Sequence, residues 1–156
     1  MPEETKREES TVALRNAIQH LLEKFSIEPS VISDGLNFAA QSPDDTGRFL
    51  QEVVRDVVEA TAFRLEAPPF TFQLLLEAYR RDQPLLAVRG KVGLALFGEA
   101  ILETEATPDD CVTALRDLGL LPNEGGEVVK MIANQVRYVE SSMAEFRRIA
   151  RETFRE

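Results

Sequence analysis

Apolar residues recur every three or four positions along most of the chain, which is the period of an α-helix that buries one face. A first helix is expected to start near Ser10 or Thr11 and to stop before Pro29. Its apolar stripe consists of Leu14, Ile18, Leu21 and Phe25. No segment sustains the strict apolar and polar alternation of a strand. The pattern therefore predicts an all-α, single-domain bundle of six to seven helices.

Local start and stop signals divide the rest of the chain. The sequences SPDD at 42–45 and TPDD at 107–110 each place a capping hydroxyl before a proline and two carboxylates. This order suits the first turn of a helix, whose free N–H groups need acceptors. Gly119 predicts a left-handed stop just after a helix that ends near Leu118. The further helices are expected near 30–40, 43–66, 70–82, 85–103, 108–118 and 124–154.

The segment VRGKVGLALFGEA, residues 88–100, holds three glycines and a Gly-Lys step. A phosphate-binding loop of the Walker type needs a glycine where Leu85 stands and a serine or threonine where Val92 stands. The segment is instead apolar nearly all round as a helix, which indicates burial. We therefore predict that 85–103 is a buried central helix.

The glycines of this helix each cost about 1 kcal/mol of helix propensity relative to alanine, and close approach of a neighbour is the usual compensation. Arg89 and Lys91 are expected to reach solvent beside it, with an anion site at the helix start as the alternative. A second hypothesis is a bundle that binds a small apolar or amphipathic ligand beside the 85–103 helix. Its candidate groove residues are Tyr79, Gly90, Gly93, Phe97 and Gly98.

The helix at 124–154 is the longest, and apolar residues follow spacings of three and four throughout it. Such a seam is typical of two helices that pack side by side at a shallow angle. The seam residues are Val129, Ile132, Val136, Val139, Met143, Phe146 and Ala150. Their partner is either another helix of the same chain, which a bundle readily supplies, or a second copy.

The chain is acidic, with 27 Asp and Glu against 18 Lys and Arg and a net charge of -9. This charge repels a phosphate backbone, so nucleic acid is a disfavoured partner. No apolar run approaches the roughly 20 residues that cross a bilayer. Residues 1–9 are charged and lack a secretory signal, so we expect a flexible tail before a domain at 10–156 and a cytoplasmic location.

Metal and catalytic chemistry finds few candidate residues. His20 is the only histidine, which excludes a three-histidine zinc site and paired Glu-x-x-His motifs. Cys111 is alone, so it forms no internal disulfide and is expected to be a small buried residue. We therefore expect no catalytic residues, no metal and no cofactor.

Three carboxylates at helical spacing, Glu52, Asp56 and Glu59, alternate with Arg48 and Arg55. This mixture predicts a solvated face with local ion pairs rather than a metal site. Together, these features favour a non-enzymatic protein-interaction module, such as an adaptor, a regulatory subunit or an assembly subunit. We expect it to form homo-oligomers through the C-terminal seam.

Overall fold

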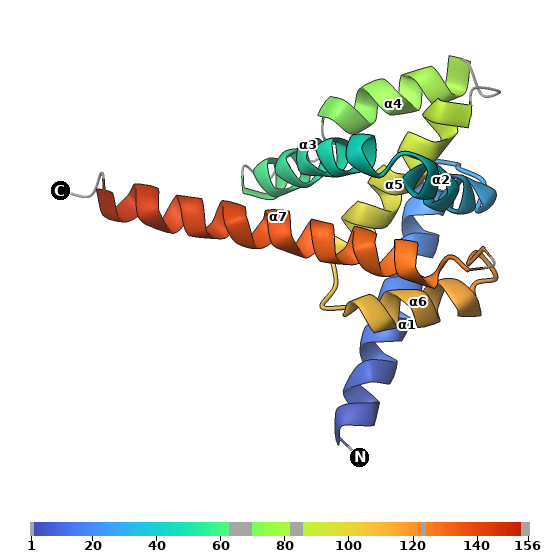
Figure 1. Ribbon diagram of the computed structural model, residues 1–156, viewed down its shortest axis with the longest axis horizontal. Coiled ribbons are helices and arrows are strands. Elements are labelled where there is room, and N and C mark those ends of the chain that lie inside the picture. The colour runs from blue at the N-terminus through green and yellow to red at the C-terminus, as the bar shows by residue number, and fades with distance from the viewer. Residues whose placement is uncertain (1, 63–69, 82–85, 123, 154–156) are drawn as a thin grey trace.

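The computed structural model describes residues 2–62, 70–81, 86–122 and 124–153. These residues form seven helices and no strand, which confirms the predicted all-α bundle (Figure 1). The helices are α1 (Pro2–Lys24), α2 (Ser30–Gln41), α3 (Pro43–Ala62), α4 (Phe70–Arg81), α5 (Leu86–Leu102), α6 (Pro108–Asp117) and α7 (Gly126–Thr153). Among the described residues, no helix is both long and apolar enough to cross a membrane.

Helix α1 begins at Pro2, so the predicted start near Ser10 or Thr11 is wrong. The residues before Ser10 are mostly Glu, Lys and Arg, which are good helix formers, and their propensity continues the helix through a hydroxyl that could have capped it. The flexibility expected of residues 1–9 stays a prediction. The predicted stripe of α1 is buried: Leu14, Ile18, Leu21 and Phe25 are all at most 9% exposed.

The predicted start signals SPDD and TPDD and the predicted stop at Gly119 coincide with helix ends in the structure. Helix α3 begins at Pro43, while the end predicted for it near residue 66 lies outside the described residues. At the start of α6, Thr107 Oγ1 accepts from the Asp110 backbone N–H at 3.2 Å, and Asp110 Oδ2 accepts from the Thr107 N–H at 3.0 Å. After α6, Gly119 adopts a left-handed φ of 72°. These interactions satisfy backbone groups that a helix end leaves free.

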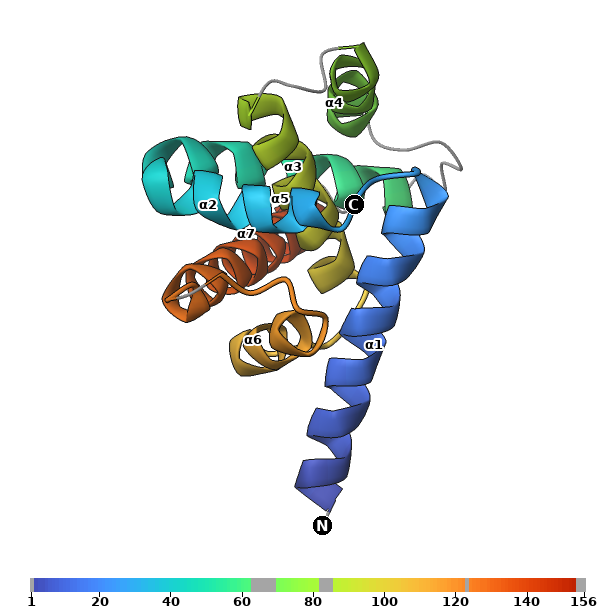
Figure 2. The same cartoon turned by 90° about the vertical axis from the view of Figure 1, so that its right-hand side faces the viewer.

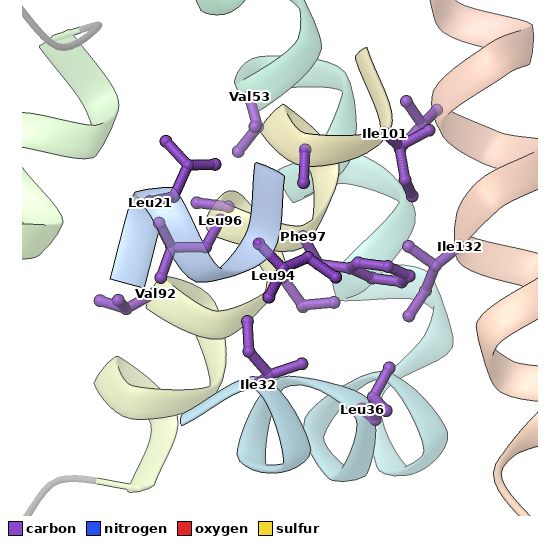
Figure 3. Close-up of a cluster of buried hydrophobic side chains, with 14 of the residues drawn as sticks. Leu21, Ile32, Leu36, Val53, Val92, Leu94, Leu96, Phe97, Ile101 and Ile132 are labelled. Atoms are coloured by element: carbon purple, nitrogen blue, oxygen red, sulfur yellow. The ribbon is translucent and has the colours of Figure 1, made fainter. Parts of the chain in front are cut away.

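Helix α5 is the centre of the bundle, and α1, α2, α3, α4 and α7 all pack against it. From Val92 to Ile101, every residue of α5 except Glu99 is buried. Figure 3 shows Leu94 above Ile32 of α2 and Phe97 pointing toward Ile132 of α7. This arrangement confirms the predicted buried, glycine-bearing central helix.

Helices α2 and α5 approach so closely that their backbones touch. A Cβ atom added to Gly93 would lie 2.0 Å from the carbonyl oxygen of Val31, and one added to Gly35 would lie 2.8 Å from the backbone nitrogen of Leu94. Real Cβ atoms essentially never come this near to another heavy atom. Glycine at both positions therefore permits the most extensive contact between two helices in the described part of the chain.

Helix α7 packs along α3, α5 and α6 over its first half and then leaves the bundle (Figure 1). Val129, Ile132 and Val136 in the first half are fully buried. The C-terminal end extends past the end of α3, whereas the N-terminal end of α1 leaves the bundle in a different direction (Figures 1 and 2). The bundle thus covers only part of its longest helix.

Candidate interaction surface

A groove with a volume of about 560 Å³ lies between α3 and α7, in the region where α7 begins to leave the bundle. Its lining combines apolar, polar and charged side chains from the two helices. The lining residues are Gln51, Arg55, Glu59, Tyr138, Val139, Ser142 and Met143. We call this feature the α3–α7 groove.

The apolar part of the groove comes from α7. Val139 is 8% exposed and Met143 is half-buried, so both reach the floor of the groove. Tyr138 is 67% exposed beside them, although tyrosine has a large apolar ring. An apolar floor with an exposed aromatic residue at its edge is a composition found in protein interfaces.

Residues 143–153 form what we call the outer segment of α7, which begins at the last lining residue of the groove, Met143, and continues beyond it. Ile149 in this segment is 49% exposed. The Arg148 guanidinium pairs with Glu145 one turn before it and with Glu152 one turn after it, the latter at 3.0 Å. The pair with Arg148 also lowers the pKa of Glu145. These exposed pairs join residues three and four positions apart, a spacing that supports a helix from its own side chains.

The predicted interaction seam is divided by the structure. Val129, Ile132, Val136 and Val139 are buried in their own chain. Met143 and Ala150 are half-buried in the outer segment, and the side chain of Phe146 lies outside the described residues. The first part of the seam therefore packs within the chain, and only the part from Met143 onward is available to a partner.

The five candidate ligand-groove residues do not line a described pocket. Helix α2 fills the space over Gly90 and Gly93 with Phe38 and Val31, and Gly98 lies against side chains of α3 and α7. Tyr79 and Phe97 are at most 5% exposed. Close packing of α2 against α5 accounts for Gly90 and Gly93, whereas a Cβ atom at Gly98 would make only ordinary contacts of 3.7 Å or more.

Arg89 does not create an anion site at the start of α5. Its Nε donates to Asp34 Oδ2 at 2.9 Å, and its Nη2 lies 3.5 Å from Glu28 Oε2. The hydrogen bond to Asp34 raises the pKa of Arg89. Arg89 is therefore engaged with α2, whereas Lys91 lies 5.9 Å from the ring centre of Phe49.

Arg137 forms a connection that sequence reasoning missed. Its Nη2 donates to the carbonyl oxygens of Ile101, Thr104 and Ala106 at 2.9, 2.6 and 3.2 Å. Its Nη1 pairs with Glu140 at 3.1 Å. One side chain of α7 thus satisfies carbonyl groups at the end of α5 and in the connection that follows it. This connection fixes α7 one residue before the groove begins at Tyr138.

The lone thiol lies in the core. Cys111 is 0% exposed, and burial raises its pKa to about 12. A thiol in this state is a poor nucleophile because the thiolate is the reactive form. The structure therefore confirms that Cys111 is buried, and His20 is exposed on α1.

A half-buried carboxyl group makes stability depend on pH. Desolvation of Glu99 on α5, together with the nearby Glu103 carboxylate, raises its pKa from 4.5 to about 7, and Lys24 of α1 opposes this rise only in part. Between these two pH values the folded chain keeps a proton that the unfolded chain has released. The free energy of unfolding therefore falls as pH rises through this window.

Replacing Glu99 with glutamine should remove the loss of stability that occurs as pH rises. At about pH 8 we expect Glu99→Gln to raise the free energy of unfolding by about 1 to 2 kcal/mol over the wild type, and at about pH 4 by much less. Urea unfolding at both pH values measures the difference. The exposed neighbour Glu105→Gln is the matched control and should show no such dependence. An equal effect of Glu99→Gln at both pH values would contradict the assignment.

The carboxylates of α3 do not gather into a metal site within the described part of the chain, where no group of three metal-ligating side chains occurs. Glu52 and Glu59 are exposed and Asp56 is half-buried, while Arg48 pairs with Asp45 at 3.8 Å. Arg55 and Glu59 both line the α3–α7 groove.

A scan against protein-family models finds no match, and searches of curated proteins and of solved structures find no similar chain.

Proposed function

We propose that this protein is a non-enzymatic helical interaction module that self-associates through the α3–α7 groove and the outer segment of α7. The observation that carries the proposal is the course of α7, which is 28 residues long and continues beyond the bundle that buries its first half. The continuing part presents Ile149 at 49% exposure and lies next to the α3–α7 groove, whose floor is apolar. A helix that lies in a groove is a common mode of protein recognition.

A second copy of the chain is the occupant that the proposal names. Each copy offers both a projecting helix and a groove beside its base, so two copies can exchange the same contact. The groove is an open trough between two helices rather than an enclosed chamber, which suits a helix better than a small molecule. A dimer would cover apolar surface that a single chain leaves in water.

Mass measurement in solution tests the proposal. Sedimentation equilibrium up to high micromolar concentration should find a dimer for the wild type. Met143→Glu and Ile149→Glu each place a charge in the proposed contact and should weaken dimerisation by about 100-fold, because burying an unpaired charge is costly. Ile149 is 49% exposed, so the circular dichroism and melting of the Ile149→Glu monomer should change little. Met143 packs against the core, so the melting of the Met143→Glu monomer is measured alongside its dimerisation.

Leu86→Glu is the matched control because Leu86 is 70% exposed on α5, away from the groove. It adds the same charge and removes a similar apolar surface, and it should leave dimerisation unchanged. A wild type that stays monomeric throughout the concentration range would overturn the proposal. Equal weakening by Leu86→Glu would also count against it, since the effect would then come from net charge.

A further inference from the structure

One line of side chains runs along α7 from its bundled half into the outer segment and is left largely uncovered. At about 3.6 residues per turn, six positions fall within about 40° of a single line along the helix. These positions, which we call the outer stripe, are Met131, Gln135, Tyr138, Ser142, Glu145 and Ile149. Gln135 is half-buried, and the other five are exposed. The outer stripe is therefore a face of α7 that its own chain does not bury.

The outer stripe gathers exposed apolar side chains. Six large hydrophobic residues are exposed in the described part of the chain, and three of them, Met131, Tyr138 and Ile149, lie on the stripe. Single exposed apolar residues are normal, but a row of them along one helix face is typical of an interaction surface. Tyr138 and Ser142 also line the α3–α7 groove, so a helix that lies on the stripe borders the groove.

We infer that the two copies pair antiparallel along the outer stripe, about a two-fold axis at the level of residue 140. This pairing rests on the proposed self-association and adds to it a surface, a direction and a register. The stripe is symmetric about that level, because 131 and 149, 135 and 145, and 138 and 142 are each equally far from 140. Met131 then faces the partner's Ile149, and Tyr138 faces the small side chain of the partner's Ser142. Each contact occurs twice.

The polar positions of the stripe favour the antiparallel direction. In an antiparallel pair Gln135 faces the partner's Glu145, whose carboxylate can accept a hydrogen bond from the Gln135 amide. In a parallel pair each stripe residue faces the same residue of the other copy. The two Glu145 carboxylates would then lie side by side and repel each other.

The register follows from the stripe and from the extent of burial along α7. In any register not centred on residue 140, at least one of Met131 and Ile149 has no stripe residue opposite it. Among the described residues of α7, Val139 is the last that is buried. An axis at residue 140 therefore lays the outer segment of each copy along the bundled half of the partner's α7. The two bundles lie at opposite ends of the helix pair and do not collide.

Charge substitutions test the direction. Gln135→Glu should weaken dimerisation by about tenfold in sedimentation equilibrium, because the new carboxylate meets the partner's Glu145 at two places. Glu145→Lys faces a neutral glutamine and should stay within about threefold of the wild type. The double variant Gln135→Glu with Glu145→Lys sets opposite charges together twice and should also return to within about threefold of the wild type.

A parallel pair gives a different result for the same double variant. It would set like charges together at both positions, so a double variant as weak as Gln135→Glu would overturn the inference. Gln19→Glu makes the same chemical change at an exposed position of α1 and should have no effect. Circular dichroism of each variant checks that α7 remains helical.

Disulfide cross-linking tests the register. Positions 135 and 145 face each other across the axis, so an equal mixture of Gln135→Cys and Glu145→Cys chains should cross-link. Neither variant alone should do so, because two copies of either position lie about 15 Å apart along the helix pair. The native Cys111 is 0% exposed and does not compete. Cross-linking of Glu145→Cys with itself, as a parallel pair would give, would overturn the inference.

Met131→Glu separates this pairing from the proposed function. Met131 lies on the stripe, but it neither lines the α3–α7 groove nor belongs to the outer segment. The pairing predicts that Met131→Glu weakens dimerisation by about 100-fold, as Ile149→Glu does, whereas Leu86→Glu leaves it unchanged. A dimer weakened by Ile149→Glu and not by Met131→Glu retains self-association and overturns the stripe pairing. A wild type that stays monomeric removes both.

Discussion

Gly93→Ala is expected to lower the free energy of unfolding by about 3 kcal/mol. The added Cβ would lie 2.0 Å from the carbonyl oxygen of Val31 and 2.9 Å from its carbonyl carbon. Backbone atoms cannot turn aside as the end of a side chain can, so α2 and α5 must separate. This loss outweighs the gain of about 1 kcal/mol in helix propensity that alanine brings.

Gly47→Ala provides the matched control for this prediction. Gly47 is also inside a helix, but a Cβ atom there would have no neighbour within 4 Å. Only the propensity term remains, so Gly47→Ala should raise stability by about 0.5 to 1 kcal/mol. Urea unfolding followed by circular dichroism measures both variants. A Gly93→Ala protein as stable as the wild type would contradict the close approach of the α2 and α5 backbones.

Arg137→Met should lower the free energy of unfolding by about 2 to 3 kcal/mol. The substitution removes a charged donor from three carbonyl oxygens and breaks the pair with Glu140, while it keeps most of the apolar stem. The Arg137 side chain is 29% exposed, so water can replace part of what is lost and limits the effect. Amide hydrogen exchange should also accelerate between residues 101 and 106.

Two further variants make the Arg137 prediction specific. Arg137→Lys keeps the charge but lacks the planar fork that spans several acceptors, so it should recover only a part of the stability. Arg148→Met removes an arginine of the same helix whose pairs are exposed, and its stability should stay close to that of the wild type. If the stability of Arg137→Met were also close to that of the wild type, the contacts with the α5 end would contribute little to the fold.

Local signals explain which parts of this fold follow from sequence. The start of α6 at TPDD and its end at Gly119 depend on backbone groups within a few residues, and the structure confirms both. The burial of α5 follows from apolar residues all around one helix. The start of α1 was missed because helix propensity outweighed a candidate cap, and nothing in the spacing of residues weighs one against the other.

The candidate site depends on contacts that no local pattern specifies. The α3–α7 groove exists because Arg55 and Glu59 come beside Tyr138 and Met143, from segments far apart in the chain. The acceptors of Arg137 likewise lie in another segment, so the sequence identified only its charge. The seam pattern continued unchanged along α7 and gave no sign of the point where burial within the chain ends.

The position of Arg137 has a consequence for how two copies would meet. Arg137 ties the middle of α7 to the end of α5 immediately before Tyr138. The wall of the groove that begins at Tyr138 is therefore held as rigidly as the core. Rigid surfaces lose little conformational entropy on association. Only the outer segment would then lose conformational entropy when two copies pair. Mutations that loosen the end of α5 should therefore slow dimerisation although they lie outside the contact between the copies.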